Sequence, residues 1–502
     1  MWMLDELKKQ EKSDKVAVMR RETSLTYRQL WQQSEAIANY ILKTAKTDAP
    51  VVIYGNKDIE IVPAMVGILK SGRAYVPVDI TFPLDRLEKI AKSTKAEFLF
   101  DFASLSAPTA HRQVIDRQDL QRIVEEVDIP EIEERNWVKN NDICYILFTS
   151  GSTGEPKGVQ ITKKNILNFV EWFLPYAKVR PNGAALNQVS YSFDVSVIQL
   201  YIYLPLQTTL FSVDKEMIGY FGALFAHLAT SNLTSWVSTP SFIEMCAVYD
   251  NFNRDLLPRL EKIILAGEVL TKKLVRTLWK KFPGVEIING YGPTEGTVLL
   301  TCCRITEEMV EDDEHNLPIG SLVNDATFWI EREDKTTTTE QNKKGELLVS
   351  SQNISKGYYN NPSATEKRFF MTDDGWAYRT GDLVYRRKKR FYYCGRVDFQ
   401  IKLNGYRIEL DDISRNLNRL ACIGNNVVLP VEREGRVAYL VAFITLSSPV
   451  DLSPAKISIR VRKELAQYVP SYMIPKKIVV VEQFPLNTNG KIDRKKLMEN
   501  YL

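Results

Sequence analysis

The sequence is poor in features that several common classes of protein require. Its 66 lysine and arginine residues nearly balance its 62 aspartate and glutamate residues, so the charge gives no support for a nucleic-acid partner. The basic cluster at 386–390 is interpreted as the solvated tip of a hairpin. No apolar run reaches the roughly eighteen residues of a membrane span, and the first residues do not resemble a signal peptide. We therefore expect a cytoplasmic protein with no membrane partner.

Cysteine and histidine are too few and too scattered for the sites that they usually build. The six cysteines contain no C-x-x-C pair, which argues against a disulfide framework. None of the three histidines lies near the glycine-rich segment described below. A histidine-based catalytic triad or a zinc site is therefore not expected.

The chain is long enough for more than one domain. A single hydrophobic core seldom serves 502 residues, so we expect at least two domains. Near the N-terminus, Thr26 and Gln29 form a capping-box pattern ahead of apolar residues at helical spacing. Strand and helix patterns then alternate, which predicts parallel sheets flanked by helices. Strands are predicted at 51–54, 74–77, 185–188, 209–212, 235–238, 262–265 and 286–288, and a helix is predicted at 61–70.

The pattern changes towards the C-terminus. Between Gly345 and Gly395, short strand patterns separated by turn residues predict an antiparallel β-subdomain. Farther on, helices at 408–420 and 458–468 and strands at 426–430 and 439–445 predict a small α+β domain. The predicted fold is therefore α/β. A large N-terminal domain, 1–397, has parallel sheets flanked by helices plus the β-subdomain, and a small mobile α+β domain occupies 398–502. A run of threonines at 336–339 is a predicted hairpin tip.

The segment FTSGSTGEPKGV at 148–159 gives the main indication of function in the sequence. It follows an apolar run that predicts a buried strand, and it combines glycines and hydroxyl side chains with Lys157. Glycines let backbone N–H groups approach a polyphosphate, hydroxyls add donors, and a lysine adds a positive charge. The segment is not a Walker A loop, because its lysine precedes the last glycine. Two interpretations remain, a phosphate-binding loop and a flexible Gly/Ser turn.

Other motifs accompany this segment in a defined order. They are LKSGRAYVPVD at 69–79, NGYGPTE at 289–295, GEL at 345–347, YRTGD at 378–382, GRVD at 395–398 and NGKID at 489–493. Together they resemble the core motifs of the adenylate-forming (ANL) superfamily, which contains acyl-CoA synthetases, luciferases and peptide-synthetase adenylation domains. The segments SYSFDVS at 190–196, STPSF at 238–242 and DFQIK at 398–402 are similar to those of stand-alone D-alanine:D-alanyl carrier protein ligases.

This resemblance implies a site for ATP and Mg²⁺, whose residues carry over position by position. The phosphate-binding residues would be Thr149, Ser150, Gly151, Thr153 and Lys157, with Thr294 on the α-phosphate and Glu295 on Mg²⁺. The residues around adenine and ribose would be Gly267, Glu268, Asn289, Gly290, Tyr291, Gly292, Pro293, Asp382, Tyr393 and Arg396. Catalysis would depend mainly on Lys491, which would bridge the substrate carboxylate and the α-phosphate, where charge accumulates. The alternatives are that Tyr291 only packs, that Asp382 binds its own backbone in a turn, and that Lys491 is a surface lysine.

The substrate prediction begins with Asp194. It lies at the start of a largely apolar stretch, where an unpaired carboxylate would be costly and a substrate ammonium group would neutralise it. The alternative is that Asp194 caps the following helix. By resemblance, the side-chain pocket is lined by Val195, Ile198, Val237, Ile264, Ala266, Gly290, Val298 and Leu299. D-alanyl ligases of the family carry cysteine at the position of Ala266 and a larger side chain at that of Gly290, so we expect a roomier pocket. The set of lining residues resembles proline-activating adenylation pockets at Val195, Ile264, Ala266 and Val298. D-alanine and L-proline are therefore predicted about equally, ahead of other small L-amino acids.

The expected enzyme is a ligase that activates a small amino acid and loads it onto a carrier protein. No carrier domain follows the NGKID motif, so the carrier is expected to be a separate protein bearing phosphopantetheine. Asp398 is the predicted hinge, because one C-terminal lysine has to serve adenylation and then make room for the pantetheine arm. The alternatives are a coenzyme A ligase for acyl or aryl acids and an inactive nucleotide-binding module.

Overall fold

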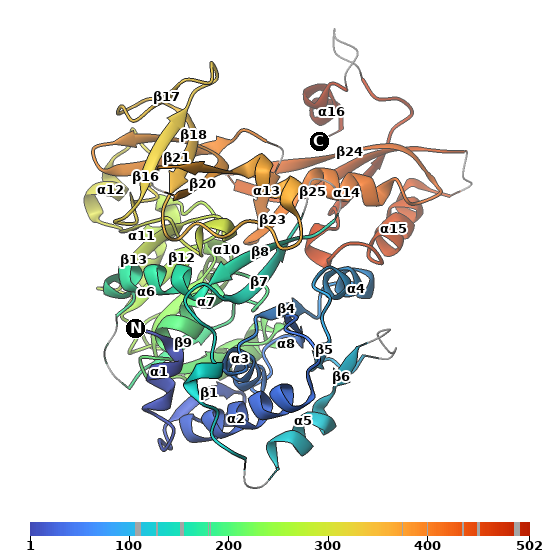
Figure 1. Ribbon diagram of the computed structural model, residues 1–502. Helices are drawn as coiled ribbons and strands as arrows, with labels where there is room; N and C mark the ends of the chain where they lie inside the picture. The colour runs from blue at the N-terminus through green and yellow to red at the C-terminus, as the bar shows by residue number, and fades with distance from the viewer. Residues whose placement is uncertain are drawn as a thin grey trace. The chain divides into compact units, whose positions relative to one another are not determined.

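The computed structural model describes residues 1–502 except 106–111, 127–128, 151–154, 179, 181, 374, 399, 434–435, 449–451, 486–491 and 502. Figure 1 traces the chain from its N-terminus to its C-terminus. The described residues form two compact units. The first comprises Met1–Ile80, Ala91–Phe148 and Lys157–Val397, and the second comprises Thr81–Ile90, Thr149–Pro156 and Asp398–Leu502. The last crossing from one unit to the other falls between Val397 and Asp398.

The helix near the N-terminus begins where its capping sequence predicts. Helix α2 (Tyr27–Thr44) follows Thr26, whose hydroxyl accepts from the backbone N–H of Gln29. The Gln29 side chain accepts in return from the N–H of Thr26 at 2.9 Å. These reciprocal bonds satisfy two N–H groups that the helix itself leaves free, so the predicted capping box is confirmed.

A six-stranded sheet carries the glycine-rich segment. Its strand order is β6-β5-β3-β4-β7-β8, and the pairs that join β6, β5, β3, β4 and β7 are parallel. The strands are β3 (Val51–Gly55), β4 (Tyr75–Asp79), β5 (Phe98–Asp101), β6 (Gln113–Ile115), β7 (Ile143–Thr149) and β8 (Lys157–Thr162). The helices between or near them are α1 (Met3–Lys8), α3 (Ile61–Lys70), α4 (Leu84–Ser93), α5 (Arg117–Val124), η1 (Glu134–Asn136) and α6 (Lys163–Ala177). The predicted alternation of strand, helix and strand is therefore confirmed.

A nine-stranded sheet has the order β15-β14-β13-β12-β11-β9-β10-β1-β2, with a parallel centre from β13 to β1. Its strands are β1 (Val16–Arg20), β2 (Thr23–Thr26), β9 (Ala184–Asn187), β10 (Thr209–Ser212), β11 (Leu233–Ser238), β12 (Lys262–Ala266), β13 (Glu286–Tyr291), β14 (Thr301–Arg304) and β15 (Ser321–Leu322). The five strands predicted between 185 and 288 are all present, within two or three residues at their ends. The associated helices are α7 (Ser196–Ile198), the π-helix η2 (Gln199–Tyr203), α8 (Lys215–Ile218), α9 (Phe221–Ala229), α10 (Pro240–Ala247), α11 (Lys272–Lys281), η3 (Thr294–Gly296) and α12 (Glu307–Glu311).

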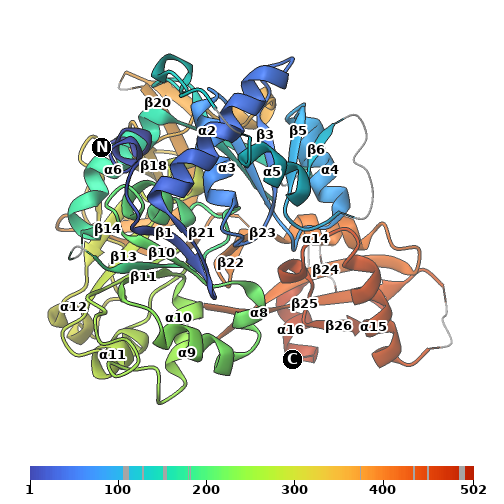
Figure 2. The ribbon, with the colours of Figure 1, turned by 90° about the horizontal axis from the view of Figure 1, so that it is seen from below.

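The two faces of this sheet belong to different hydrophobic cores. On β12, Ile263 and Leu265 pack with α9, α10 and α11, which lie together in Figure 2. Ile264 and Ala266 face the other way, into the core that also contains residues of α2, α3 and α6. This division follows from the alternation of side chains along a strand. It places the predicted pocket residues of β12 on one face only.

An antiparallel subdomain follows, as predicted. Its strands are β16 (Thr327–Glu331), β17 (Thr337–Thr338), β18 (Gly345–Ser350), β19 (Phe369–Thr372), β20 (Gly375–Arg387) and β21 (Arg390–Arg396), with α13 (Pro362–Arg368) before β19. The basic cluster lies at the β20–β21 turn, where Lys388 has a φ of 56°. The tip predicted at 336–339 is wrong in detail. The turn closes earlier, because Arg332 donates to the carbonyl oxygen of Thr336 at 2.8 Å, and Thr337–Thr338 pairs as a strand.

The second unit contains a hairpin, a three-stranded sheet and helices. Its elements are β22 (Gln400–Leu403), β23 (Tyr406–Glu409), α14 (Leu410–Leu417), β24 (Ile423–Arg433), β25 (Arg436–Leu446), α15 (Pro454–Leu465), η4 (Ser471–Met473), β26 (Lys477–Val480) and α16 (Arg494–Tyr501). The helix predicted from Ile408 begins at Leu410, because Ile408 pairs with Ile401 across the β22–β23 hairpin. Strand pairing therefore overrides the helical spacing of the apolar residues at this point.

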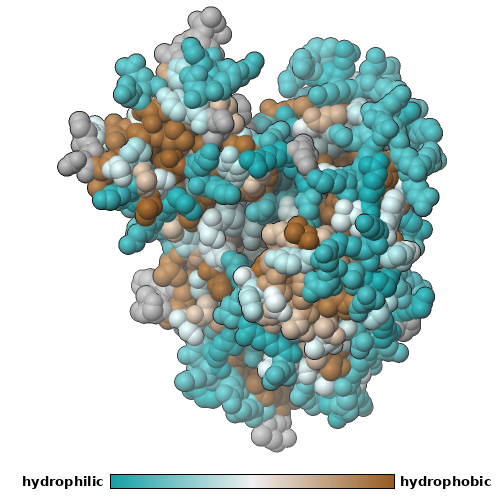
Figure 3. Space-filling model, turned by 180° about the vertical axis from the view of Figure 1, so that it is seen from behind, coloured by the Kyte–Doolittle hydropathy of each residue, from teal (hydrophilic) through white to brown (hydrophobic). Residues whose placement is uncertain are grey.

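The surface carries scattered apolar groups. Figure 3 shows one face on which hydrophilic residues predominate and hydrophobic residues form separate patches. Large apolar side chains that are well exposed include Tyr220, Val248 and Ile459. Within the described residues, no helix combines the length and the apolar character needed to cross a membrane.

Candidate active site

The glycine-rich segment joins two neighbouring strands of the six-stranded sheet. Thr149 ends β7 and Lys157 begins β8, and these strands lie side by side in Figure 1. Ser150 is buried, whereas Gly151 and Thr153 lie outside the described residues. The Lys157 ammonium is 5.6 Å from the ring centroid of Tyr358, within cation–π range. The ring of Tyr358 therefore stabilises the positive charge at the start of β8.

The same tyrosine connects this lysine to the NGYGPTE motif. Glu295 lies in η3 and is fully buried, and its Oε1 accepts from the Tyr358 hydroxyl at 2.7 Å. The backbone of Tyr358 pairs with that of Val159 in β8. Tyr358 thus fixes the predicted magnesium ligand relative to the strand that carries Lys157. Sequence reasoning missed Tyr358, although its place in S-K-G-Y-Y beyond the GEL motif was a visible signal.

Asp382, Arg396 and Tyr291 form a buried cluster at the predicted ribose position. Asp382 and Arg396 are partners across β20 and β21, and their Oδ1 and NH1 atoms are 2.5 Å apart. The second oxygen, Oδ2, accepts from the Tyr291 hydroxyl at 2.6 Å. Asp382 therefore bonds side chains at both oxygens, and Tyr291 makes a hydrogen bond in addition to its packing. Burial, and next the charge of Asp382, raises the pKa of Tyr291 well above its usual value.

The other predicted nucleotide residues have partners within the protein. Asn289 donates through Nδ2 to the carbonyl oxygen of Pro318 at 2.8 Å. The Oε2 of Glu268 accepts from the N–H of Ser241 in the first turn of α10, at 3.0 Å. Gly267 has a φ of 90°, which favours glycine at the end of β12. Pro293 is the N-cap of η3, and Tyr393 is half-buried in β21.

The predicted side-chain pocket is assembled from three parts of the first unit. Val237 and Ile264 are direct partners on β11 and β12, and Ala266 faces Gly290 across β12 and β13. The apolar side chains among the predicted lining residues all belong to one core cluster, with at most 4% of their surface exposed: Val195, Ile198, Val237, Ile264, Ala266, Val298 and Leu299. Val237, Ile264, Ala266 and Gly290 therefore lie on neighbouring strands of the nine-stranded sheet, and the other apolar residues belong to the core on that face.

One part of the volume prediction does not fit this geometry. A Cβ atom built on Gly290 would lie 2.9 Å from both methyl carbons of Leu299. The space that glycine leaves is thus occupied by a leucine from the loop between η3 and β14. Of the two positions expected to enlarge the pocket, Gly290 therefore does not leave the expected space.

Asp194 lies half-buried, two positions before Ser196, the first residue of the short helix α7. The N-cap of that helix is Val195, and no side-chain hydrogen bond caps it. The capping aspartate remains an alternative, since Asp194 precedes this N-cap by one residue. The charge of Asp194 is one of the causes, after burial and Tyr75, that raise the pKa of the buried Tyr145. This places a carboxylate at the edge of the apolar cluster.

Comparison with known families identifies the chain. A family model described as AMP-binding enzyme matches residues 5–359, and one described as AMP-binding enzyme C-terminal domain matches residues 419–491. The first model alone covers more than half of the sequence. The chain belongs to the AMP-binding enzyme family. This AMP-binding enzyme is therefore an AMP-forming ligase that uses ATP.

Relatives and solved structures agree with this assignment. Proteins named "D-alanine--D-alanyl carrier protein ligase" from Bacillus licheniformis and Bacillus cytotoxicus are 37% and 36% identical, with 99% of each chain covered. The Vibrio cholerae adenylation domain AlmE, solved with glycyl-adenosine-5'-phosphate, has a TM-score of 0.84 at 21% identity, with 99% of this chain and 97% of that one covered. Holo-PA1221, with adenylation and PCP domains, has a TM-score of 0.82 at 24% identity, with 99% and 84% covered. These two structures share the fold of this AMP-binding enzyme.

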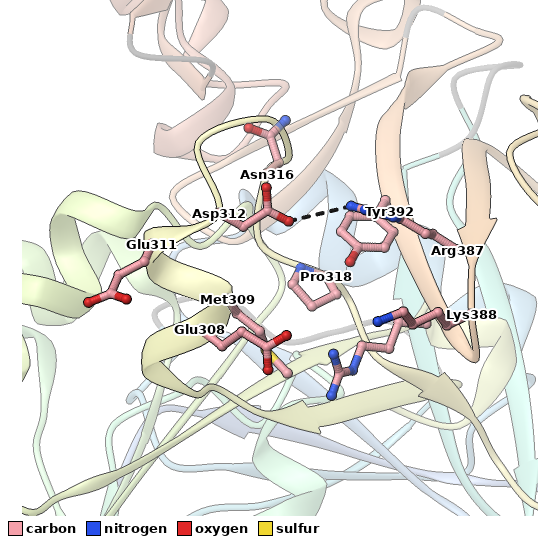
Figure 4. Close-up of a pocket in the computed structure, with 10 residues that line it drawn as sticks. Glu308, Met309, Glu311, Asp312, Asn316, Pro318, Arg387, Lys388 and Tyr392 are labelled. Carbon is pink, nitrogen blue, oxygen red and sulfur yellow. Dashed lines mark hydrogen bonds and ion pairs between the residues drawn. The ribbon is translucent and has the colours of Figure 1, made fainter.

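A separate cavity of about 340 Å³ lies beside α12 in this AMP-binding enzyme. Figure 4 shows Glu308 and Lys388 directed into it from opposite walls. Near it, the acidic groups of Asp312 and Glu314 approach His315 closely enough to suggest a metal site. Arg387 occupies this place instead, 2.8 Å from His315 Nδ1 and 3.5 Å from Asp312 Oδ2. A guanidinium group therefore already binds two members of this cluster.

Proposed function

We propose that this AMP-binding enzyme activates a small amino acid as aminoacyl-AMP and transfers it to the phosphopantetheine thiol of a separate carrier protein. The observation that carries the proposal is the position of Asp194, a half-buried carboxylate beside an apolar cluster. A substrate ammonium group could form a charge-assisted hydrogen bond with this carboxylate, an interaction that the plain acid of a coenzyme A ligase cannot make. The names of the 37% and 36% identical relatives agree with an amino acid and a carrier protein.

The nucleotide would bind to the residues assigned by their motifs. Tyr291 would stack on adenine, helped by Asn289 and the Gly267–Glu268 turn. Asp382 would accept from the ribose hydroxyls, with Arg396 beside it. The glycine-rich segment and Lys157 would hold the β- and γ-phosphates, and Thr294 the α-phosphate. We propose that the ribose hydroxyls then replace the Tyr291 hydroxyl on Asp382, since both would approach the same buried oxygen, Oδ2.

Glu295 fits the proposed role of magnesium ligand, since Mg²⁺ takes oxygen ligands and often binds one or two carboxylates together with substrate phosphates. Its buried carboxylate is oriented by the Tyr358 hydroxyl, as an outer-shell partner orients a metal ligand. When bound, Mg²⁺ would neutralise phosphate charge. The protein itself would orient the amino-acid carboxylate, whose oxygen forms a bond to the α-phosphorus while the bond to pyrophosphate breaks. The pantetheine sulfur then bonds to the carbonyl carbon and AMP departs.

Lys491 lies outside the described residues, and its role remains a proposal. It would bridge the amino-acid carboxylate and the α-phosphate, where negative charge accumulates in the transition state. In this proposal, residues 1–397 form the adenylation core and residues 398–502 the mobile domain that carries the lysine. Asp398 would be the hinge that moves Lys491 away before the thiol arrives. Because the reaction consumes ATP, a cytoplasmic location remains part of the proposal.

For the amino acid itself, D-alanine and L-proline remain the two candidates. A pocket with the proposed apolar lining would disfavour a charged or large aromatic side chain, and Leu299 takes the space beside Gly290. The difference between alanine and proline is a few methylene groups, each worth about 1–3 kcal/mol in such a pocket. The substrate is therefore decided by small differences in the same set of contacts.

Amino-acid-dependent exchange of labelled pyrophosphate into ATP tests the proposal. Both enantiomers of alanine, L-proline and plain carboxylic acids would be compared, with Asp194→Ala as the variant and Asp250→Ala, an exposed aspartate, as the control. We expect exchange with a small amino acid, lost in Asp194→Ala and unchanged in the control. Exchange with a plain acid and coenzyme A would instead identify a coenzyme A ligase. No exchange with any acid would indicate an inactive binding module.

A further inference from the structure

The loop that fills the space beside Gly290 has a strained backbone. Thr297 and Val298 have φ values of 51° and 71°, in the left-handed region that branched side chains seldom occupy. The N–H of Leu299 donates to the carbonyl oxygen of Thr297 at 2.9 Å. A hydrogen bond across two residues with a positive central φ is the rare, strained form of the γ-turn. Such strain persists only where the surrounding structure holds it.

A single buried asparagine holds this γ-turn at both ends. The Thr297 hydroxyl donates to the backbone oxygen of Asn353 at 2.6 Å. The Nδ2 of Asn353 donates to the carbonyl oxygen of Leu299 at 3.2 Å. Asn168 on α6 in turn donates to Asn353 Oδ1 at 2.7 Å, which sets the orientation of the amide. Asn353 is fully buried, so each of these bonds is protected from water.

The strand beside the γ-turn is shaped to receive it. A Cβ on Gly290 would meet the Leu299 side chain, and a Cβ on Gly292 would lie 2.5 Å from the carbonyl oxygen of Val298. Both glycines of the N-G-Y-G-P segment are thus places where the γ-turn comes too close for a side chain. Leu299 is 1% exposed in the core cluster shared with Ala266 and Ile264. The wall at this position is therefore set by the clamped γ-turn as well as by the strand.

We propose that Asn353 is a positioning residue for amino-acid selection, and that it acts by clamping the strained γ-turn so that Leu299 limits the depth of the pocket. This inference rests on the proposed amino-acid site. It goes beyond that site because Asn353 lies outside the predicted lining. Release of the γ-turn would withdraw Leu299, weaken the hold on a small substrate and admit a larger one.

The variant Asn353→Asp tests this role. It keeps the shape of the side chain and the acceptor for Asn168, but it turns a carboxylate oxygen towards the Leu299 carbonyl. Loss of a buried hydrogen bond typically corresponds to about a tenfold change in an equilibrium. In pyrophosphate exchange we expect the KM for the preferred amino acid to rise about tenfold, and the preference over the next larger aliphatic amino acid to fall by a similar factor. The KM for ATP should change by less than about twofold, well below the effect of one lost hydrogen bond.

Asn165→Asp is the matched control. Asn165 donates from α6 to the carbonyl oxygens of Gln352 and Ile354, on either side of Asn353, but makes no bond to the γ-turn. The aspartate retains the oxygen that accepts from the N–H of Thr162. Asn353→Ala provides a second variant without a new charge if Asn353→Asp does not fold. Selectivity should change in the Asn353 variants and stay at the wild-type level in the control.

Three results would overturn the inference. They are an equal change in Asn353→Asp and Asn165→Asp, a parallel rise of the KM for ATP and for the amino acid, and unchanged selectivity in both Asn353 variants. If the wild type exchanges pyrophosphate only with a plain acid, the proposed function is refuted. The KM values of the Asn353 and Asn165 variants for that acid would then still test whether Asn353 positions the γ-turn. If no acid supports exchange, both proposals are refuted.

Discussion

The hydroxyl of Tyr291 provides a test of the nucleotide site that needs no knowledge of the amino acid. Tyr291→Phe keeps the ring, which is proposed to stack on adenine, and removes the hydroxyl that donates to Asp382 Oδ2. Asp382 is 2% exposed, so water does not readily replace the lost donor. A hydrogen bond to a charged group typically contributes about 1.5–3 kcal/mol. The free energy of unfolding without nucleotide should therefore fall by about 2 kcal/mol.

Nucleotide should reverse this loss. If ribose hydroxyls take the place of the tyrosine hydroxyl on Asp382, the bound states of the wild type and the variant are nearly equal in free energy. By linkage, AMP should then bind Tyr291→Phe more tightly, by up to about thirtyfold for full recovery of 2 kcal/mol. Urea unfolding with and without saturating AMP, and calorimetric titration with AMP, measure the two effects.

Tyr385→Phe is the control for this experiment. Tyr385 lies in the same strand as Asp382 and stacks on Tyr392 at 4.9 Å, and its hydroxyl makes no hydrogen bond within the described part of the chain. Its removal should change the free energy of unfolding by less than about 0.5 kcal/mol. The reasoning would be refuted if Tyr291→Phe bound AMP tenfold more weakly, or if its loss of stability persisted at saturating AMP.

Three further predictions follow from the chain. Lys491→Ala should nearly abolish adenylate formation in pyrophosphate exchange but slow thiol transfer from preformed adenylate much less; an equal loss in both would make the lysine structural. Asp398→Pro should leave pyrophosphate exchange intact and block carrier loading in a gel-shift assay. Normal loading would show that Asp398 is not the hinge. Alkylation of the native protein at pH 8 should modify at most Cys394 and Cys422, which are half-buried, since burial raises the pKa of the other four thiols, two of them to about 12. A third reactive thiol would contradict this.

Local sequence signals were sufficient for most of the fold. Two kinds of signal are formed by residues close together in the chain and are therefore visible in the sequence. They are the capping box at Thr26 and Gln29 and the apolar strand patterns of the nine-stranded sheet. The helix predicted from Ile408 failed because its first residues pair with a strand whose position depends on the tertiary fold. The motifs also singled out Tyr291 and Asp382, which the structure brings into direct contact across 91 positions of the chain.

The wall of the pocket could not be predicted in the same way. The glycine at 290 predicted free space in the pocket. The sequence does not show that the side chain of Leu299 approaches this glycine and fills the space. That approach depends on the γ-turn at 297–299, where two branched residues adopt a backbone that their own preferences disfavour. The sequence also does not show which residues Asn353 and Tyr358 contact, because their partners Thr297 and Glu295 lie 56 and 63 positions away in the chain.

The two faces of β12 also have an evolutionary consequence. Ile263 and Leu265 hold the layer of helices α9 to α11, whereas Ile264 and Ala266 face the proposed substrate. Exchanges at the second pair leave the contacts of the first pair intact. A lineage can therefore acquire a new substrate through substitutions at Ile264 and Ala266, while Ile263 and Leu265 stay unchanged and keep the helices packed against the sheet.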